Sequence, residues 1–154
     1  MKPLKKILLA ILVVFITIQF IQPTKNKSDQ ILPTDISKVF IVPENVQAAL
    51  KTSCYDCHSN NTHYPWYSFI QPGAWLMASH IKEGKADLNF NEFGNYTERK
   101  QQNKLRAIGK SIDDGSMPIP AYTMIHTDAK LTKDQKALIL DWVNRTRDSF
   151  SKTN

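Results

Sequence analysis

The sequence predicts an all-α domain of about four helices, preceded by a separate apolar N-terminal helix. Four stretches after residue 43 repeat their apolar side chains with the spacing of one helical face. No run of alternating β-branched residues stands out in the same region. The roughly 100 residues found there are enough for one compact core. No internal repeat argues for a second domain.

The first two predicted helices both begin at a proline, a residue that is favoured in the first turn. One starts at Pro43 and carries Val46 and Leu50 on one face. The other starts at Pro72 and runs toward Gly84. These starts place two helices in the first half of the domain.

The third and fourth helices have side-chain caps. Thr97 stands where the third helix needs an N-cap, and Thr132 with Gln135 forms a capping-box pattern for the fourth. The residues expected on the buried faces are Leu105, Ile108 and Ile112 in the third helix, and Leu138, Ile139, Trp142 and Val143 in the fourth.

The N-terminus has the pattern of a membrane-targeting segment. A short lysine-containing head precedes an almost wholly apolar run over residues 7–21. No motif of small residues for cleavage follows this run. We therefore expect an uncleaved anchor over residues 1–21, with a helix crossing the membrane once. Because positive charges stay in the cytoplasm, the rest of the chain is expected on the extracytoplasmic side.

The remaining chain divides by composition and charge. Residues 22–42 are polar and contain prolines, so we expect a linker, followed by the folded domain over residues 43–150. Residues 1–30 hold five lysines and one aspartate, and so carry +4 of the +6 formal charge. Residues 31–154 carry the remaining +2, so the basic character lies mostly in the N-terminal segment and argues against a nucleic-acid partner.

One motif carries the chemistry of the domain. Cys54 and Cys57, the two cysteines of the chain, are followed directly by His58 in the pattern C-x-x-C-H. This is the attachment signature of a c-type haem. Two thiols on one helical turn can form thioethers to the two vinyl groups of one porphyrin, and the imidazole can bind its iron. We predict one covalently bound haem c.

Three other interpretations of the cysteines stay open. A redox dithiol favours a strand before the motif, whereas residues 43–51 read as helix. A zinc site needs further ligands at fixed spacing, which the other histidines do not offer. A disulfide between the two cysteines closes a loop too short to stabilise the fold much. None of the three requires His58 next to the second cysteine.

The iron also needs a sixth ligand or an open site. Met117 is the first candidate, because Gly115 allows a turn before it and Pro118 stiffens the chain beyond it. A methionine on such a loop can approach iron from the face opposite His58, although it can also fill a gap in the core. The alternative ligands are His80, His126 and Met124.

Aromatic residues cluster between the motif and the second helix. The candidates for the wall of a haem pocket are Tyr64, Trp66, Tyr67 and Trp75. Flat rings can cover a porphyrin, and their polar tips can reach a propionate. Ordinary core packing is the other explanation for the same residues.

The arrangement resembles class I cytochromes c and, more closely, the bacterial haem-binding domain family of small proteins with an N-terminal membrane segment. The stretches that carry the resemblance are 54–62, 64–67, 80–85, 88–90, 117–118, 126–132 and Trp142. The cytochrome resemblance implies thioethers at Cys54 and Cys57, His58 as the proximal ligand and Met117 as the distal one. It also implies a cytochrome c-like fold around the haem.

Two functions follow from a single haem. In the first, the protein is an electron carrier in the periplasm, attached to the bacterial cytoplasmic membrane, and serves an unidentified redox partner protein. In the second, it is a haem-based sensor or a peroxidase-like enzyme with an open or displaceable distal site. We favour the carrier over a catalyst, because no paired carboxylates in an apolar setting, nucleophile motif or phosphate loop stands out in the sequence.

Overall fold

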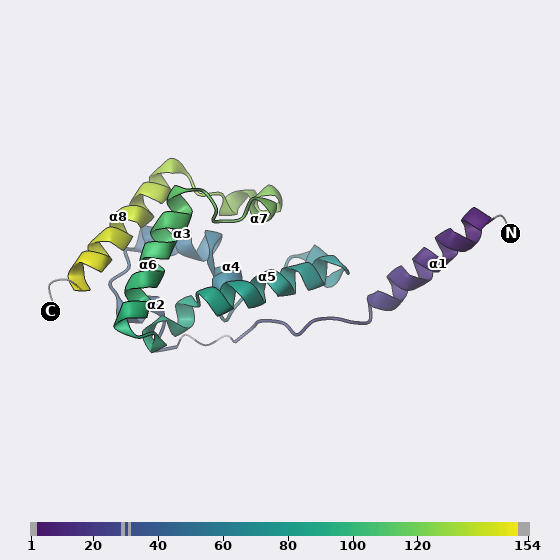
Figure 1. The fold of residues 1–154 in the computed structure, drawn as a ribbon, viewed down its shortest axis with the longest axis horizontal. Coiled ribbons are helices and arrows are strands. Elements are labelled where there is room, and N and C mark those ends of the chain that lie inside the picture. The colour runs from purple at the N-terminus through teal and green to yellow at the C-terminus, as the bar shows by residue number, and fades with distance from the viewer. Residues whose placement is uncertain (1–2, 29, 31, 151–154) are drawn as a thin grey trace.

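The computed structural model describes residues 3–28, 30 and 32–150 (Figure 1). These residues form α-helices and short 3₁₀ helices (η) and no strand, which confirms the all-α prediction. The elements are α1 (Pro3–Ile18), α2 (Ile36–Val39), α3 (Glu44–Ser53), α4 (Tyr55–His58), η1 (Trp66–Phe69), α5 (Gly73–Asp87), η2 (Phe90–Asn95), α6 (Glu98–Asp113), α7 (Pro120–Ile125), η3 (Thr127–Ala129) and α8 (Lys133–Phe150).

The four predicted helices of the domain are α3, α5, α6 and α8. Helices α2, α4 and α7 have only four to six residues, too few to show a periodic apolar pattern. Pro43 and Pro72 each stand at the N-cap of their helix, so both helices begin one position later than predicted. Helix α5 also runs on past Gly84 to Asp87.

Helices α6 and α8 lie side by side and form one end of the domain (Figure 1). Their predicted apolar faces are buried, with Leu105 and Ile139 fully inaccessible to solvent. Leu138 is the exception, because its side chain is 40 % exposed. It lies beside the buried stripe of α8, which runs through Ile139, Trp142, Val143 and Thr146.

Both predicted caps are formed. The Thr97 hydroxyl accepts a hydrogen bond from the backbone N–H of Lys100, at 3.4 Å. At the start of α8 the N–H of Gln135 donates to the Thr132 hydroxyl, at 3.1 Å, and the Gln135 side chain accepts from the N–H of Thr132, at 2.9 Å. These caps satisfy donors that the first helical turn leaves without partners.

Part of the predicted linker is packed into the domain. Ile36 is 1 % exposed and belongs to the main core. Asp35 caps α2 and accepts a hydrogen bond from the Asn91 side-chain amide, at 2.7 Å. The Trp142 ring N–H donates to the Ile41 carbonyl, at 3.1 Å. Residues 32–42 therefore follow the surface of the domain and contribute to its core.

The N-terminal segment forms the 16-residue helix α1, which extends away from the body (Figure 1). Its side chains are largely exposed. Across the described residues, no helix has both the length and the apolar character to cross a membrane. The crossing helix expected over residues 1–21 is therefore not found. At 1.5 Å per residue α1 is about 24 Å long, shorter than the ~30 Å hydrocarbon layer. Residues 1–2 of the expected anchor lie outside the described range, as do residues 29 and 31 of the expected linker.

Candidate functional site

The C-x-x-C-H motif is folded into a single helical turn. Cys54 ends α3 and is also the N-cap of α4, with φ −129° and ψ −34°, so the helix axis breaks at this residue. The carbonyl of Cys54 accepts hydrogen bonds from the N–H groups of Cys57, at 3.3 Å, and His58, at 3.0 Å. Both thiols are free and half-buried. The turn brings the two sulfur atoms and the imidazole to one side of α4.

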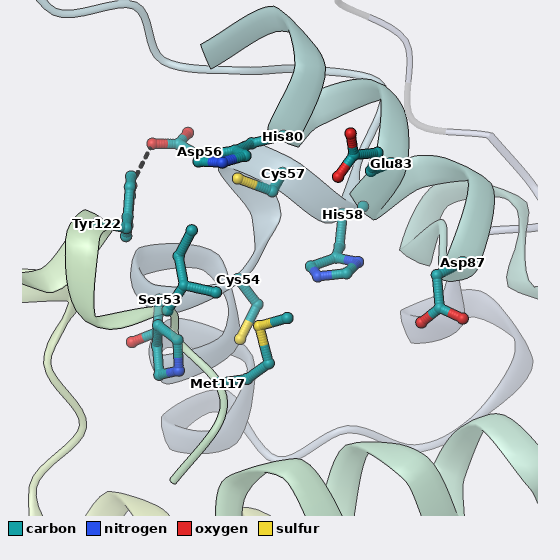
Figure 2. Close-up of a pocket in the computed structure, with 13 residues that line it drawn as sticks. Ser53, Cys54, Asp56, Cys57, His58, His80, Glu83, Asp87, Met117 and Tyr122 are labelled. Carbon is teal, nitrogen blue, oxygen red and sulfur yellow. Dashed lines mark hydrogen bonds between the residues drawn. The ribbon is translucent and has the colours of Figure 1, made fainter. Parts of the chain in front are cut away.

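These side chains face a cavity of about 410 Å³ between α4, α5 and the segment that leads from α6 into α7 (Figure 2). It is lined by Cys54, Cys57, His58, His80 and Met117, among others. A second cavity of about 160 Å³ shares Cys54, His58 and Met117 and continues along α6. The structure thus brings the predicted thiols, proximal ligand and first-choice distal ligand to one space. The volume falls within the range of cofactor sites, about 300–1,000 Å³.

The imidazole of His58 is oriented by the end of α5. Its Nδ1 lies 3.0 Å from the carbonyl oxygen of Leu88, the C-cap residue of α5. A carbonyl can only accept, so this bond places the proton on Nδ1 and leaves the Nε2 lone pair available. Metal-binding histidines are usually fixed in this way, because the ring nitrogen that does not bind the metal donates a hydrogen bond to the protein. His58 is therefore prepared to bind a metal through Nε2.

A glycine allows α4 and α5 to approach closely. A Cβ atom on Gly84 would lie 2.7 Å from the backbone oxygen of Cys57 and 3.2 Å from its Cβ. Real Cβ atoms do not come so near to backbone oxygen, so any larger residue at position 84 has to push the two helices apart. Gly84 thus sets the distance between α5 and the second cysteine.

Burial changes the acidity of both thiols. It raises the pKa of Cys54 to about 12 and that of Cys57 to about 11, with Cys57 and Asp56 respectively adding a smaller electrostatic effect. Redox-active dithiols have the opposite property, a lowered pKa that provides a thiolate at neutral pH. The two cysteines therefore lack the electrostatic setting of a disulfide oxidoreductase.

Met117 lies on the predicted loop between two helices. Gly115 has φ +74°, the left-handed conformation that the turn requires. The N–H of Ser116 donates to the Asp114 carboxylate, at 2.9 Å, and the N–H of Met117 donates to the Ser111 carbonyl, at 3.0 Å. The Met117 side chain is 38 % exposed and reaches the cavity. The loop is thus held by hydrogen bonds while its thioether stays accessible.

A hydrogen bond joins α7 to the motif across the cavity. The Tyr122 hydroxyl donates to the carboxylate of Asp56, at 2.6 Å (Figure 2). Burial and the Asp56 carboxylate together raise the pKa of Tyr122, so the phenol remains protonated. The other oxygen of Asp56 accepts from the N–H of His63, at 2.9 Å. Asp56 thus ties the motif to the helix that follows the Met117 loop.

We expect Tyr122→Phe to destabilise the fold by about 1.5 to 3 kcal/mol, because it removes a hydrogen bond to a charged acceptor. Urea unfolding measures this loss. Tyr55→Phe is the control: the Tyr55 ring stacks on Phe90 at 4.9 Å, and among the described residues its hydroxyl makes no hydrogen bond. That variant should stay within about 0.5 kcal/mol of the natural protein. Equal losses in both variants would contradict a structural role for the Tyr122 bond.

The alternative ligands are placed very differently. His80, on α5, lines the main cavity together with His58. His126 instead stacks on Tyr122, with ring centroids 4.2 Å apart, and makes a short hydrogen bond to the Tyr67 hydroxyl. It lines a third cavity, of about 160 Å³, which adjoins the main one. Met124 is 79 % exposed. Geometry therefore favours Met117 and His80 over His126 and Met124.

None of the four aromatic candidates for the pocket wall lines the main cavity. Tyr64 accepts a hydrogen bond from the N–H of Asn26, at 2.7 Å, because the N-terminal segment packs against it. Trp66 is 76 % exposed, and the ring N–H of Trp75 donates to the Ile21 carbonyl. Tyr67 lines the same cavity as His126, and that cavity shares Cys57 and His80 with the main one.

Sequence reasoning missed Asp56, Gly84, Tyr122 and the Leu88 carbonyl. A glycine inside a helical pattern is a signal for close packing, so Gly84 was recognisable as a contact point. The bond between Asp56 and Tyr122 joins residues 66 positions apart, and no local pattern predicts it. The role of Leu88 belongs to its backbone and is independent of its side chain.

Residues 13–145 match the haem-binding domain family. The chain belongs to this family. Family membership assigns a haem cofactor to it, in agreement with the prediction from the motif. Comparison with curated proteins and with solved structures gives no match.

The site of this haem-binding domain fits its cofactor. The free Nε2 of His58 provides a nitrogen ligand, and Met117 provides a thioether on the same cavity. The two free thiols lie on the adjoining turn. Nitrogen and sulfur donors around a largely apolar space are the donor set that haem iron takes from proteins.

Proposed function

We propose that the protein is a monohaem c-type cytochrome that carries electrons on the extracytoplasmic side of a membrane. Cys54 and Cys57 would hold the porphyrin through thioethers, His58 would bind the iron through Nε2, and Met117 would be the distal ligand. When bound, haem supplies one-electron chemistry. The protein's part is to orient the cofactor and restrict access to the iron.

The convergence of His58 and Met117 on one cavity is the observation that supports the proposal most. The two residues are far apart in sequence and come from α4 and from the loop after α6. Histidine and methionine together saturate the iron and raise its potential, which suits electron transfer. A carrier needs no substrate site beyond this arrangement.

A second function is favoured by His80. Its side chain lines the same cavity, and Glu83 and Asp87 follow on the same face of α5. Were Met117 not to bind the iron, His80 would be the residue of the cavity that could serve as an acid–base group. This is the arrangement that a peroxidase-like enzyme or a gas sensor requires.

The Met117→Ala variant tests the carrier against this alternative. We expect it to lose the weak far-red absorption band of sulfur-bound ferric haem, to have a lower reduction potential and to bind carbon monoxide in the ferrous state. Optical spectra and redox titration measure all three. Met124→Ala is the matched control, because Met124 lies outside the cavity, and it should leave the three properties unchanged.

An unaltered spectrum in Met117→Ala would contradict methionine ligation. If His80→Ala then converted the ferric iron to high spin, the distal ligand would be His80. In that case the carrier would have two histidine ligands, and Met117 would only fill space in the cavity.

The proposal includes attachment to the membrane through the N-terminal segment. Leu4, Ile7 and Leu8 are each more than half exposed, and apolar side chains continue around α1. Such a surface is stable only when something apolar covers it. We expect the full chain to sediment with bacterial membranes and to keep residues 1–21 in its mature form, as measured by fractionation and intact mass. A soluble periplasmic form beginning after Pro23 would contradict this.

A further inference from the structure

A second cavity with a distinct chemistry lies on the other side of α5. It has a volume of about 330 Å³ and is lined by Lys25, Lys82 and Lys85, together with Asn26, Tyr64 and Ile81. Among the residues that the structure describes, no carboxylate lines it. This cavity shares no lining residue with the haem cavity.

Helix periodicity explains the difference between the two cavities. Positions 78, 81, 82 and 85 of α5 face the lysine cavity, and positions 80, 83, 84 and 87 face the haem cavity. Each set follows the spacing of one helical face. The lysines and the carboxylates of α5 are thereby sorted onto opposite sides of the helix.

Two of the three ammonium groups are held in place. The Lys85 Nζ donates to the side-chain oxygen of Asn26, at 2.6 Å. The Asn26 amide in turn donates to the Ser59 carbonyl, at 2.8 Å, which fixes its orientation. Lys25 lies over the ring of Phe69, with its Nζ 3.4 Å from the ring centroid. These contacts position the cations without neutralising them.

Within the described part of the chain, none of the three lysines forms an ion pair with a carboxylate. The ion pairs found among the described residues join Lys104 to Asp87 and Arg145 to Asp141, and neither pair involves this cavity. Like charges brought together in this way repel each other. An anion in the cavity removes that repulsion and accepts hydrogen bonds from the ammonium groups.

The neighbouring surface indicates what kind of anion this is. The chain leaving α1 is fixed to the domain here, since the N–H of Gln71 donates to the Gln19 side chain, at 2.9 Å, and the Gln71 side chain donates to the Ile21 carbonyl, at 2.7 Å. Phe69, Ile70 and other apolar side chains are exposed beside this point. Figure 1 shows the chain from α1 running alongside α5. Aromatic and basic residues next to an apolar helix are typical of the headgroup region of a membrane.

We propose that the cavity formed by Lys25, Lys82 and Lys85 binds the phosphate headgroup of an anionic phospholipid. Binding there holds the haem-binding domain against the membrane in one orientation, with α5 at the surface. The inference deepens the membrane attachment proposed above and rests on it. It assigns a lipid class to a surface of the folded domain.

The test uses the full-length, haem-loaded protein and a mixture of two vesicle populations. One population is phosphatidylcholine, and the other also contains phosphatidylglycerol. After equilibration the populations are separated, and the ratio of bound protein is measured. Binding to phosphatidylcholine alone reports on α1, whereas the ratio reports on the lysine cavity.

We expect the natural protein to prefer the anionic vesicles. Replacing Lys25, Lys82 and Lys85 together by glutamine should lower the ratio by about a hundredfold, since each lysine near an anionic surface contributes about fivefold in affinity. The control replaces the exposed Lys38, Lys51 and Lys133 by glutamine, which changes the net charge equally. It should change the ratio little, because none of these three lysines lines the cavity. Haem spectra and melting temperatures establish that both variants are folded.

Equal ratios in the two triple variants would overturn the proposal. A second arm titrates inorganic phosphate into the protein by calorimetry. If phosphate binds the natural protein but not the cavity variant, while the vesicle ratio is the same for both, the ligand is a soluble phosphate and the lipid assignment is wrong. Binding to anionic vesicles without binding to phosphatidylcholine would support the cavity and contradict attachment through α1. If the protein bound neither vesicle population, both the lipid site at the lysine cavity and the attachment through α1 would be contradicted.

Discussion

Replacing both cysteines, in Cys54→Ala/Cys57→Ala, is expected to abolish covalent haem attachment. The natural protein should keep its colour in the polypeptide fraction after extraction with acidified acetone, and its intact mass should exceed that of the apoprotein by one haem. The double variant should release all its haem into the solvent, because only coordination to iron then holds the cofactor.

The single variants provide the internal control for this result. Cys54→Ala and Cys57→Ala each retain one thiol on the same turn. Each should therefore keep haem attached by one thioether, with an absorption spectrum between those of the natural protein and the double variant. Release of all haem by the natural protein would contradict covalent attachment, although haem binding by the family would stand.

Gly84→Ala is expected to have the second largest effect. The added methyl group would lie 2.7 Å from the Cys57 carbonyl oxygen, a backbone atom that cannot turn aside. Overpacking of this kind costs about 1–3 kcal/mol. A loss of about 2 kcal/mol would lower the melting temperature by about 4 to 8 °C. Because the clash pushes α4 away from α5, haem loading should fall as well, as measured by the ratio of haem to protein absorbance.

Gly109→Ala is the matched control, because Gly109 also lies inside a long helix. A Cβ atom at Gly109 would meet its nearest neighbour, a methyl group of Val143, at an ordinary 3.5 Å. Alanine is favoured over glycine in helices by about 1 kcal/mol, so this variant should be unchanged or slightly more stable. Should the two variants melt alike, α4 and α5 would not be in such close contact.

The elements that the sequence predicted well are those whose signals are local. The Thr132–Gln135 capping box and the apolar stripe of Leu105, Ile108 and Ile112 are formed as expected. Each depends on residues three or four positions apart, which a helix necessarily brings together. The placement of Met117 on a loop follows similarly from Gly115.

The rest of the fold depends on contacts between distant residues. Phe90 and Phe93 are almost fully buried in the core, yet they stand on a short 3₁₀ helix with no periodic pattern. The break at Cys54 likewise interrupts what reads as one continuous helix. Tyr64 and Trp75 contact the N-terminal segment, through Asn26 and Ile21 respectively, and no local pattern in the sequence predicts these contacts.

The sorting of charge on α5 has an electrical consequence for the cofactor. Glu83 faces the haem cavity, as does Asp87, whose charge is paired with Lys104. Lys82 and Lys85 lie across the helix, whose diameter of ~10 Å is close to the Debye length at physiological salt. Nearby negative charge stabilises ferric iron and lowers its reduction potential, whereas the lysines act in the opposite direction. An anion that neutralises the lysines should therefore lower the potential of the haem. We therefore expect occupation of the lysine cavity to shift the reduction potential of the haem, even though the two cavities share no lining residue.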